Sequence, residues 1–443
     1  MQTPDVTRTS TTQSPGRPWK RRAWKALAAL GAVVLVGAAG VGAYYAAWKW
    51  PHRNESVAIE HSALATQYRY GADRTGVAPA DATAGPRKRY RLVWVTPRLN
   101  VGDYSASKST PAVTEREVFV ATDRGTLVAV RRSDGSRLWE FRGHPSEKGS
   151  HSSPAIDDQH VYISDYGGYV YALRKNTGTM VWESRPGDFI GSSPLLFGDT
   201  LLIGVEFRGR RGALVGLERA TGREVFRSAT LPDLCHSSPA VDAAANAAYM
   251  GDNSGGVYRW NLGVLSAAQP QRDVMPAWRF SAQPPSGDVK STPALWQHLV
   301  VATSWDHNVY AIDTASGRRA WRFTTGGLSM SSPSIDASRT LVVAGSHDGN
   351  VYGLDVNSGK ERWRFRAGGP VMSSATLLPH EGVGIIGSSN AMCHVFDLDS
   401  GAIHQSLWLY SGLTGVPVAV GRHLYLFDHL GHLYAYTSAD RTR

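Results

Sequence analysis

The chain has 443 residues, of which 42% are hydrophobic, so it can bury one large core or two ordinary ones and is not an intrinsically disordered chain. Its 47 Lys and Arg residues outnumber its 37 Asp and Glu residues. Eight of the basic residues and a single acid lie in residues 1–53, so the remainder is nearly balanced. This distribution argues against a nucleic-acid partner, which requires a basic surface on the folded domain.

The first predicted element is a membrane anchor. Residues 1–25 are rich in Thr, Ser, Pro and Arg, and we predict a disordered, basic cytoplasmic tail. Residues 26–48 carry no charge and are long enough to supply the ~20 residues that span a bilayer, so we predict a transmembrane signal-anchor helix. Basic residues precede this run, which places the tail in the cytoplasm and the rest of the chain in the periplasm or outside the cell. We therefore expect a single-pass inner-membrane protein, with a cleaved signal peptide as the alternative.

The region after the anchor is predicted to be a linker. Residues 49–89 are polar and contain Gly and Pro, and residues 439–443 are predicted to form a short tail. Cys235 and Cys393 are the two cysteines of the sequence, too few for a disulfide framework or a four-cysteine zinc site. We expect two free, buried thiols. No cysteine lies near the predicted anchor, which argues against lipid attachment there.

Residues 90–438 are built from a repeated unit. Each unit opens on a six-residue phrase such as HSSPAI at His151, HSSPAV at His236 or KSTPAV at Lys108. Alignment on the fourth residue of the phrase gives eight equivalent positions: Pro111, Pro154, Pro194, Pro239, Pro293, Pro333, Ala375 and Pro417. The units are forty-odd residues long, except the fourth, which contains an insertion from Asn261. A period of this length is typical of propeller blades.

Each unit contains four short runs of β-branched and aromatic residues, separated by turn residues, which is typical of strands. The last unit lacks its fourth run, and the run around Trp94, before the first unit, is expected to supply it. We therefore predict an all-β, eight-bladed β-propeller of four-stranded antiparallel blades, closed by an N-terminal strand and preceded by the transmembrane helix.

Two recurring residue types are predicted to be structural. An aromatic residue recurs in the fourth run, and its regular phase indicates packing between blades rather than stacking on a cofactor. The positions are Trp94, Trp139, Trp182, Phe226, Trp278, Trp321, Trp363 and Trp408. Aspartates before Gly or Asn in the second hairpin, such as Asp165 and Asp252, are expected to bond their own turns rather than a metal.

The segments ALRKNTGTMVWES, AIDTASGRRAWRF and GLDVNSGKERWRF resemble the pyrroloquinoline quinone (PQQ) repeat. This repeat builds an eight-bladed superfamily that includes quinoprotein alcohol dehydrogenases and the outer-membrane assembly factor BamB. The stretch YRYGADRTGV at Tyr68 resembles the segment that often precedes such propellers. The resemblance covers about residues 68–438 and implies the fold; many members of the superfamily bind no quinone.

For a dehydrogenase, the resemblance implies a calcium site of Glu, Asn and Asp, a catalytic Asp and often a pair of adjacent cysteines. The sequence has no adjacent cysteine pair and no C-x-x-C-H haem signature, and we assign no residue to the calcium set. We therefore predict no catalytic residue, no metal site and no cofactor, with PQQ and calcium as the alternative.

The residue three positions before each aligned Pro is not fixed by the repeat. Because the first strand of each blade is innermost in this superfamily, we expect these residues to surround one mouth of the central channel: Lys108, His151, Gly191, His236, Lys290, Met330, Met372 and Thr414. The Lys, His and Met residues are the candidate ligand-binding residues. A ring that is polar without any function is the alternative. His151 and His236 are two blades apart, too far for a shared metal.

The loop EFRGRRG is expected to place Arg208, Arg210 and Arg211 beside this ring, where they suit an acidic or phosphate-bearing partner. We predict a membrane-tethered, non-catalytic scaffold or assembly factor that binds a protein partner in the cell envelope. A PQQ-dependent oxidoreductase and a sensor of small anionic ligands at the channel mouth are the alternatives. The insertion from Asn261 is expected on the opposite face, as a specificity loop or as a tolerated insertion.

Overall fold

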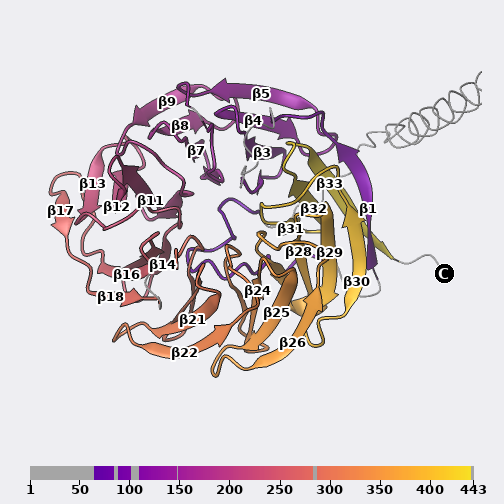
Figure 1. Cartoon of the computed structure of the whole chain (residues 1–443). Coiled ribbons are helices and arrows are strands. Elements are labelled where there is room, and N and C mark those ends of the chain that lie inside the picture. The colour runs from indigo at the N-terminus through magenta and orange to yellow at the C-terminus, as the bar shows by residue number, and fades with distance from the viewer. Residues whose placement is uncertain (1–63, 84–87, 101–108, 147, 283–286, 441–443) are drawn as a thin grey trace, which may run out of the picture. The chain divides into compact units, whose positions relative to one another are not determined.

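Eight sheets are arranged in a ring around a central axis (Figure 1). The structure is a computed structural model that describes residues 64–83, 88–100, 109–146, 148–282 and 287–440. These residues belong to one unit, Asn54–Arg443, and contain a single turn of 3-10 helix, η1 (Pro379–Glu381), among their strands. Within these ranges, no helix has the length and apolar character needed to cross a membrane. The predicted tail and anchor, residues 1–48, lie outside the described residues.

The first four blades follow one another along the chain, and each runs from an inner strand to an outer strand. The first is β2 (Ala112–Val113), β3 (Glu117–Ala121), β4 (Thr126–Arg131) and β5 (Arg137–Arg142). The second is β6 (Ala155–Ile156), β7 (His160–Ser164), β8 (Val170–Arg174) and β9 (Met180–Ser184). The third is β10 (Leu195–Phe197), β11 (Thr200–Phe207), β12 (Arg211–Glu218) and β13 (Glu224–Ser228). The fourth is β14 (Ala240–Asp242), β15 (Ala247–Gly251), β16 (Gly256–Asn261) and β18 (Trp278–Ser281).

The next three blades repeat this order. The fifth is β19 (Ala294–Trp296), β20 (Leu299–Thr303), β21 (Asn308–Asp313) and β22 (Arg319–Thr324). The sixth is β23 (Ser334–Asp336), β24 (Leu341–Gly345), β25 (Asn350–Asp355) and β26 (Glu361–Arg366). The seventh is β27 (Thr376–Leu378), β28 (Val383–Gly387), β29 (Met392–Asp397) and β30 (Ile403–Trp408).

The eighth blade joins the two ends of the described chain. Its strands are β31 (Val418–Val420), β32 (His423–Phe427), β33 (Leu433–Asp440) and, outermost, β1 (Lys88–Val95). β1 pairs with β33 in antiparallel register from Lys88↔Asp440 to Val95↔Tyr434. The predicted closure by an N-terminal strand is therefore confirmed, as is the eight-bladed, antiparallel architecture.

The insertion in the fourth unit adds a strand to the neighbouring blade. β17 (Gln271–Val274) pairs in parallel with β13, the outer strand of the third blade, through Phe226↔Gln271 and Ser228↔Val274. The third sheet therefore has five strands, while the others have four. The insertion lies between β16 and β18 of the fourth blade. It lengthens that connection and also covers the outer edge of the third blade.

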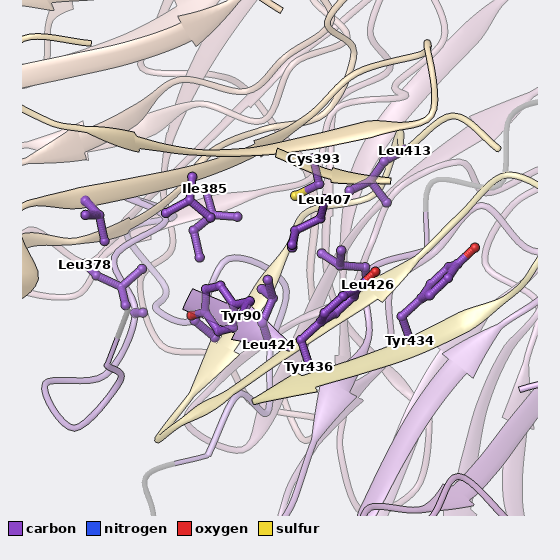
Figure 2. Packing of buried hydrophobic residues seen from close by; sticks show 14 of the residues in the cluster. Tyr90, Leu378, Ile385, Cys393, Leu407, Leu413, Leu424, Leu426, Tyr434 and Tyr436 are labelled. Carbon is purple, nitrogen blue, oxygen red and sulfur yellow. The ribbon is translucent and has the colours of Figure 1, made fainter. Parts of the chain in front are cut away.

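The hydrophobic core lies between neighbouring blades, because the middle strands are buried on both faces. β20, for example, is buried along its whole length. Figure 2 shows the cluster between the seventh and eighth blades, which includes Ile385, Cys393, Leu424 and Tyr436. Cys235 and Cys393 are both free and buried, and burial raises the pKa of each thiol.

The recurring tryptophans fasten six of the eight blades to the next blade. The indole N–H of Trp321, for example, donates to the carbonyl of Val356 at 2.7 Å, and its ring lies against Gly359 in the next blade. Gly359 has φ +70°, and a Cβ atom there would lie 2.5 Å from the indole ring. The same N–H to carbonyl contact is made by Trp94, Trp139, Trp182, Trp278 and Trp363. Glycine is therefore needed in this turn both for its backbone conformation and for its lack of a side chain.

Trp408 differs from this expectation, since 66% of its surface is exposed. The equivalent position in the seventh blade is Gln405, which pairs with Val395. Its side-chain amide bonds both the N–H and the carbonyl of Tyr90, each at 2.9 Å. The eighth blade takes its outer strand from the N-terminal side, so it has no turn before that strand against which a tryptophan could pack.

Candidate ligand-binding site at the open end of the ring

One end of the channel is closed by residues 64–83, which we call the plug. These residues belong to the predicted linker, yet they lie at the centre of the ring (Figure 1). In every blade the residue two positions after the aligned Pro donates its backbone N–H to the plug. The donors are Val113, Ile156, Leu196, Val241, Leu295, Ile335, Leu377 and Ala419, at 2.8 to 2.9 Å. The plug therefore satisfies the inner edges of all eight sheets.

Two buried arginines hold the plug in place. The Arg74 guanidinium donates to the carbonyls of Pro239 at 3.1 Å and Pro194 at 3.2 Å, and also to the carbonyl of Tyr68. Arg69 donates to Ser334 Oγ at 2.9 Å and to the carbonyl of Pro333. Burial lowers the pKa of Arg74 to about 9 and of Arg69 to about 10, so both remain charged at neutral pH. For Arg74 the carbonyls replace the water that the cation loses on burial, whereas Arg69 Nε and Nη1 have no hydrogen-bond partner among the described residues.

The second hydroxyl residue of the repeated phrase, directly before the aligned Pro, links each blade to its neighbour. Its side-chain oxygen accepts the backbone N–H of the equivalent residue in the adjacent blade. Seven such bonds of 2.9 to 3.2 Å involve the hydroxyls of Thr110, Ser153, Ser193, Ser238, Thr292, Ser332 and Ser374. We call this ring the hydroxyl belt. It is interrupted at Val416, which has no hydroxyl group.

The first Ser of the phrase accepts a backbone N–H from the second strand of its own blade. Ser237 Oγ accepts the N–H of Gly251 at 3.1 Å, and Ser331 Oγ accepts that of Gly345 at 3.0 Å. Ser291 makes the same bond with Thr303 at 3.0 Å. The two hydroxyl residues of the phrase therefore have structural roles.

Above the plug and the hydroxyl belt lies a cavity of about 360 Å³, which we call the central pocket. Its floor includes Tyr68 of the plug, and belt residues form its wall. The structure brings together seven of the eight variable positions around it: His151, Gly191, His236, Lys290, Met330, Met372 and Thr414. Lys108 lies outside the described residues. Ligand binding by these residues stays a prediction.

Two basic residues of the pocket lining, His236 and Lys290, each face a carboxylate that is not itself part of the lining. His236 Nδ1 is 3.1 Å from Glu206 Oε1, and the Glu206 side chain is fully buried. Lys290 Nζ is 3.0 Å from Asp288 Oδ2 and 3.5 Å from the centre of the Trp305 ring. Glu206 was not among our predicted site residues, although it directly precedes the arginine-rich loop.

Hairpins between the second and third strands add further residues that sequence reasoning missed. Tyr166, Trp305 and His429 each follow or precede the turn aspartate of their hairpin, and all three line the central pocket. Burial, reinforced by the charge of Glu206, raises the pKa of Tyr166 to about 12. Burial lowers the pKa of His429, which keeps its imidazole neutral. The available signal was an aromatic or His residue beside the turn aspartate of some hairpins, although it does not recur in every blade.

The predicted arginines lie beside the central pocket rather than in it. Arg208 and Arg210 line a neighbouring hollow of about 730 Å³, which shares Lys148 and Tyr166 with the pocket. Arg210 is 2.8 Å from Asp233, so part of its charge is balanced. Arg211 is exposed at the base of the hairpin, opposite Phe207, and lines neither hollow.

The pocket does not fit the calcium-bound quinone that the resemblance implies. Among the residues that the structure describes, no three His, Cys, Asp or Glu side chains are grouped to hold a metal. The buried carboxylate at the pocket, Glu206, faces His236, and Asp288 faces Lys290. A calcium site needs several converging oxygen ligands, so we derive no step that involves a quinone.

Comparison with solved structures supports the fold. A europium-containing methanol dehydrogenase aligns with a TM-score of 0.71 and 13% identity, over 84% of this chain and 98% of that one. BamB from Moraxella catarrhalis aligns with a TM-score of 0.62 and 16% identity, over 79% and 100%. The computationally designed protein Ika8 gives 0.62 and 14%, over 77% and 99%. At these identities the likeness shows the fold alone. No curated protein matches in sequence.

A family model gives the more specific result. The model described as "Outer membrane protein assembly factor BamB" matches residues 88–227, 142–263 and 275–443. These ranges contain all eight aligned phrases of the repeat. The chain therefore belongs to the PQQ-repeat propeller family whose model carries the description outer membrane protein assembly factor BamB.

Proposed function

We propose that this protein is a non-catalytic binding propeller that captures a partner protein in the cell envelope at the open end of its ring. Residues 26–48 would tether it to the inner membrane, with the ring in the periplasm or outside the cell. The single observation that carries the proposal is the asymmetry of the channel. The plug accepts a backbone N–H from every blade at one end, whereas the other end is a pocket that is lined in part by the variable position of the repeat.

Three further observations support binding rather than catalysis. The acids at the pocket face basic partners, Glu206 with His236 and Asp288 with Lys290. Cationic Arg208 lies exposed on the adjoining hairpin, where it can meet an acidic partner. The family match names an assembly factor, which fits a role in protein association.

The test is chemical crosslinking of the tagged full-length chain in its own membranes, followed by mass spectrometry of the purified adducts. Two variants obstruct the open end: Gly191→Trp, because Gly191 faces His236 and Glu206, and Lys290→Glu, which reverses a charge. We expect both to lose at least nine tenths of a reproducible wild-type adduct. Asn357→Trp, in an exposed turn of the plugged end, is the matched control and should retain it.

The enzymatic alternative is tested separately. The full-length chain is incubated with PQQ and calcium and then passed through a gel-filtration column. Because PQQ itself carries three carboxylates, the run is repeated with EDTA in place of calcium. We expect no calcium-dependent quinone absorbance in the protein peak. Stoichiometric retention of the quinone that requires calcium would overturn the non-catalytic assignment, and an adduct that survives in both open-end variants would overturn the assignment of the binding face.

A further inference from the structure

The central pocket contains buried polar groups that the protein itself does not use. Trp305 Nε1 and His429 Nε2 both lie at the pocket, are buried, and have no hydrogen-bond partner within the described part of the chain. An unmade hydrogen bond of a buried donor costs free energy, so such groups call for an explanation. An indole N–H can only donate, and a neutral imidazole donates from one of its two nitrogens. The Trp305 indole N–H therefore lacks an acceptor within the described residues, and a ligand with acceptor atoms would supply one.

The hydroxyl belt adds donors around the same cavity. In each described bond of Ser153, Ser193, Ser238, Thr292, Ser332 and Ser374, the belt hydroxyl is the acceptor. A hydroxyl that accepts one bond still has its own proton to donate. These six residues line the pocket, so O–H donors from six neighbouring blades surround one cavity.

Charge at the pocket favours an anionic acceptor. Lys290 has a side chain that is only 15% exposed, and its ammonium group lies over the Trp305 ring. Lys148 lies 4.5 Å from the centre of the Tyr166 ring at the edge of the pocket. The pocket lining includes Lys148 and Lys290 but neither Glu206 nor Asp288, whose carboxylates pair with His236 and Lys290. N–H donors and nearby ammonium groups are the usual partners of carboxylates in proteins.

The shape of the site favours an organic anion with several separated carboxylates. The donors are spread over different blades, so a single compact tetrahedral anion would not reach them together. Met330, Met372 and Val416 supply an apolar part of the wall, which suits a carbon skeleton. A volume of about 360 Å³ lies at the small end of ordinary ligand sites.

We propose that the central pocket binds a polycarboxylate directly through protein N–H and O–H donors, without a metal ion. This inference deepens the proposed function and rests on it only for the choice of the binding face. The carboxylates can belong to a free small molecule or to the acidic C-terminal end of the partner protein. Both sources present the same groups to Trp305, His429 and the belt.

The experiment is calorimetric titration of the full-length chain in detergent, with and without EDTA. The probes are citrate, the peptide acetyl-Gly-Glu-Glu with a free C-terminus, and inorganic phosphate. We expect citrate or the peptide to bind with an affinity that EDTA leaves unchanged and that exceeds the affinity for phosphate at least tenfold. Citrate binding alone identifies a free small ligand, and peptide binding alone identifies the partner's acidic end.

Variants locate the site. Trp305→Phe removes the unused indole N–H and Lys290→Gln removes the cation, so each should weaken binding at least tenfold. Trp278→Phe is the matched control, because its indole N–H donates to the Thr314 carbonyl and it does not line the pocket. Melting temperatures confirm that every variant is folded.

The inference is overturned if neither polycarboxylate binds, if EDTA abolishes binding, if phosphate binds equally well, or if folded Trp305→Phe binds like the wild type. Its failure is distinguishable from failure of the proposed function. A partner adduct at the open end without polycarboxylate binding refutes only this inference. Polycarboxylate binding without any partner adduct refutes only the scaffold role.

Discussion

The two ends of the channel differ in how far the repeat determines their contacts. At the plugged end each of the eight blades donates one backbone N–H to the plug, and the buried Arg74 donates to three carbonyls. At the open end the residue type at the variable position changes from blade to blade, and the Trp305 indole N–H has no acceptor among the described residues. The difference teaches that the residues fixed by the repeat build the ring. The open pocket combines belt hydroxyls of the repeat with residues that vary between blades, and these are available for binding.

The largest expected effect is at the plug. Arg74→Ala removes the donor of three carbonyls, two of them directly before inner strands, and should lower the free energy of unfolding by about 3–5 kcal/mol, since buried acceptors lose their partner. Urea unfolding measures it. Arg208→Ala at the open end removes an exposed arginine and should change stability by less than about 0.5 kcal/mol. Equal effects at the two sites would remove the contrast between the two ends.

A second comparison concerns two glycines with left-handed backbone. Gly359→Ala combines φ +70° with a contact at 2.5 Å to the Trp321 ring, so we expect a loss of about 2–3 kcal/mol. Gly198→Ala has φ +55° but no atom within 4 Å, so it should cost only about 1 kcal/mol. Thermal unfolding of the two variants measures the difference. A smaller loss for Gly359→Ala than for Gly198→Ala would contradict the docking of Trp321.

Low pH should reduce the free energy of unfolding because the buried His423 becomes protonated. Burial, with the charges of Arg132 and Arg422, lowers the pKa of His423 to about 4, below the ordinary value of 6.5. The unfolded chain then binds more protons than the folded chain between these values. The contribution to the free energy of unfolding is complete above about pH 6.5 and is lost as pH falls to about 4, and its size is about 3 kcal/mol. His423→Gln should flatten this part of a stability–pH curve, and an unchanged slope would exclude His423 as its cause.

The smallest expected difference in stability is between two substitutions within one phrase, MSSPSI. Ser332→Ala removes the acceptor of the buried Thr292 N–H and should cost about 1–2 kcal/mol. Met330→Ser, two residues earlier at the pocket, should cost less than about 0.5 kcal/mol because its position is only partly buried. Chemical denaturation of both variants measures this. The reverse order would mean that the variable position is structural after all.

The features that recur in every unit of the sequence could be predicted from the sequence alone. Eight units, four strands in each and the closing strand follow from period and turn chemistry, and the sheets confirm them. The plug was not predicted, because residues such as Arg69 and Arg74 in a polar segment give no sign of burial until eight inner edges are placed around them. Trp408 was misplaced because Gln405 replaces the aromatic residue where the next blade lacks its turn.

The site was predicted in part for the same reason. The variable position of the repeat is visible by alignment, and its residues surround one pocket. Trp305 and His429 belong to hairpins whose sequences differ among blades, so no period indicates them. The absence of a hydrogen-bond partner for Trp305 Nε1 and His429 Nε2 among the described residues depends on which groups lie near them in space, and the sequence does not give this.

The most direct test of the central claim is photocrosslinking of the full-length chain in its own membranes from one position at each end. The photoreactive residue p-benzoylphenylalanine replaces Arg208 at the open end or Asn357 at the plugged end, both exposed. We predict a discrete partner adduct from position 208 and none from position 357. An adduct from position 357 alone, or equal adducts from both positions, would contradict the assignment of function to the open end.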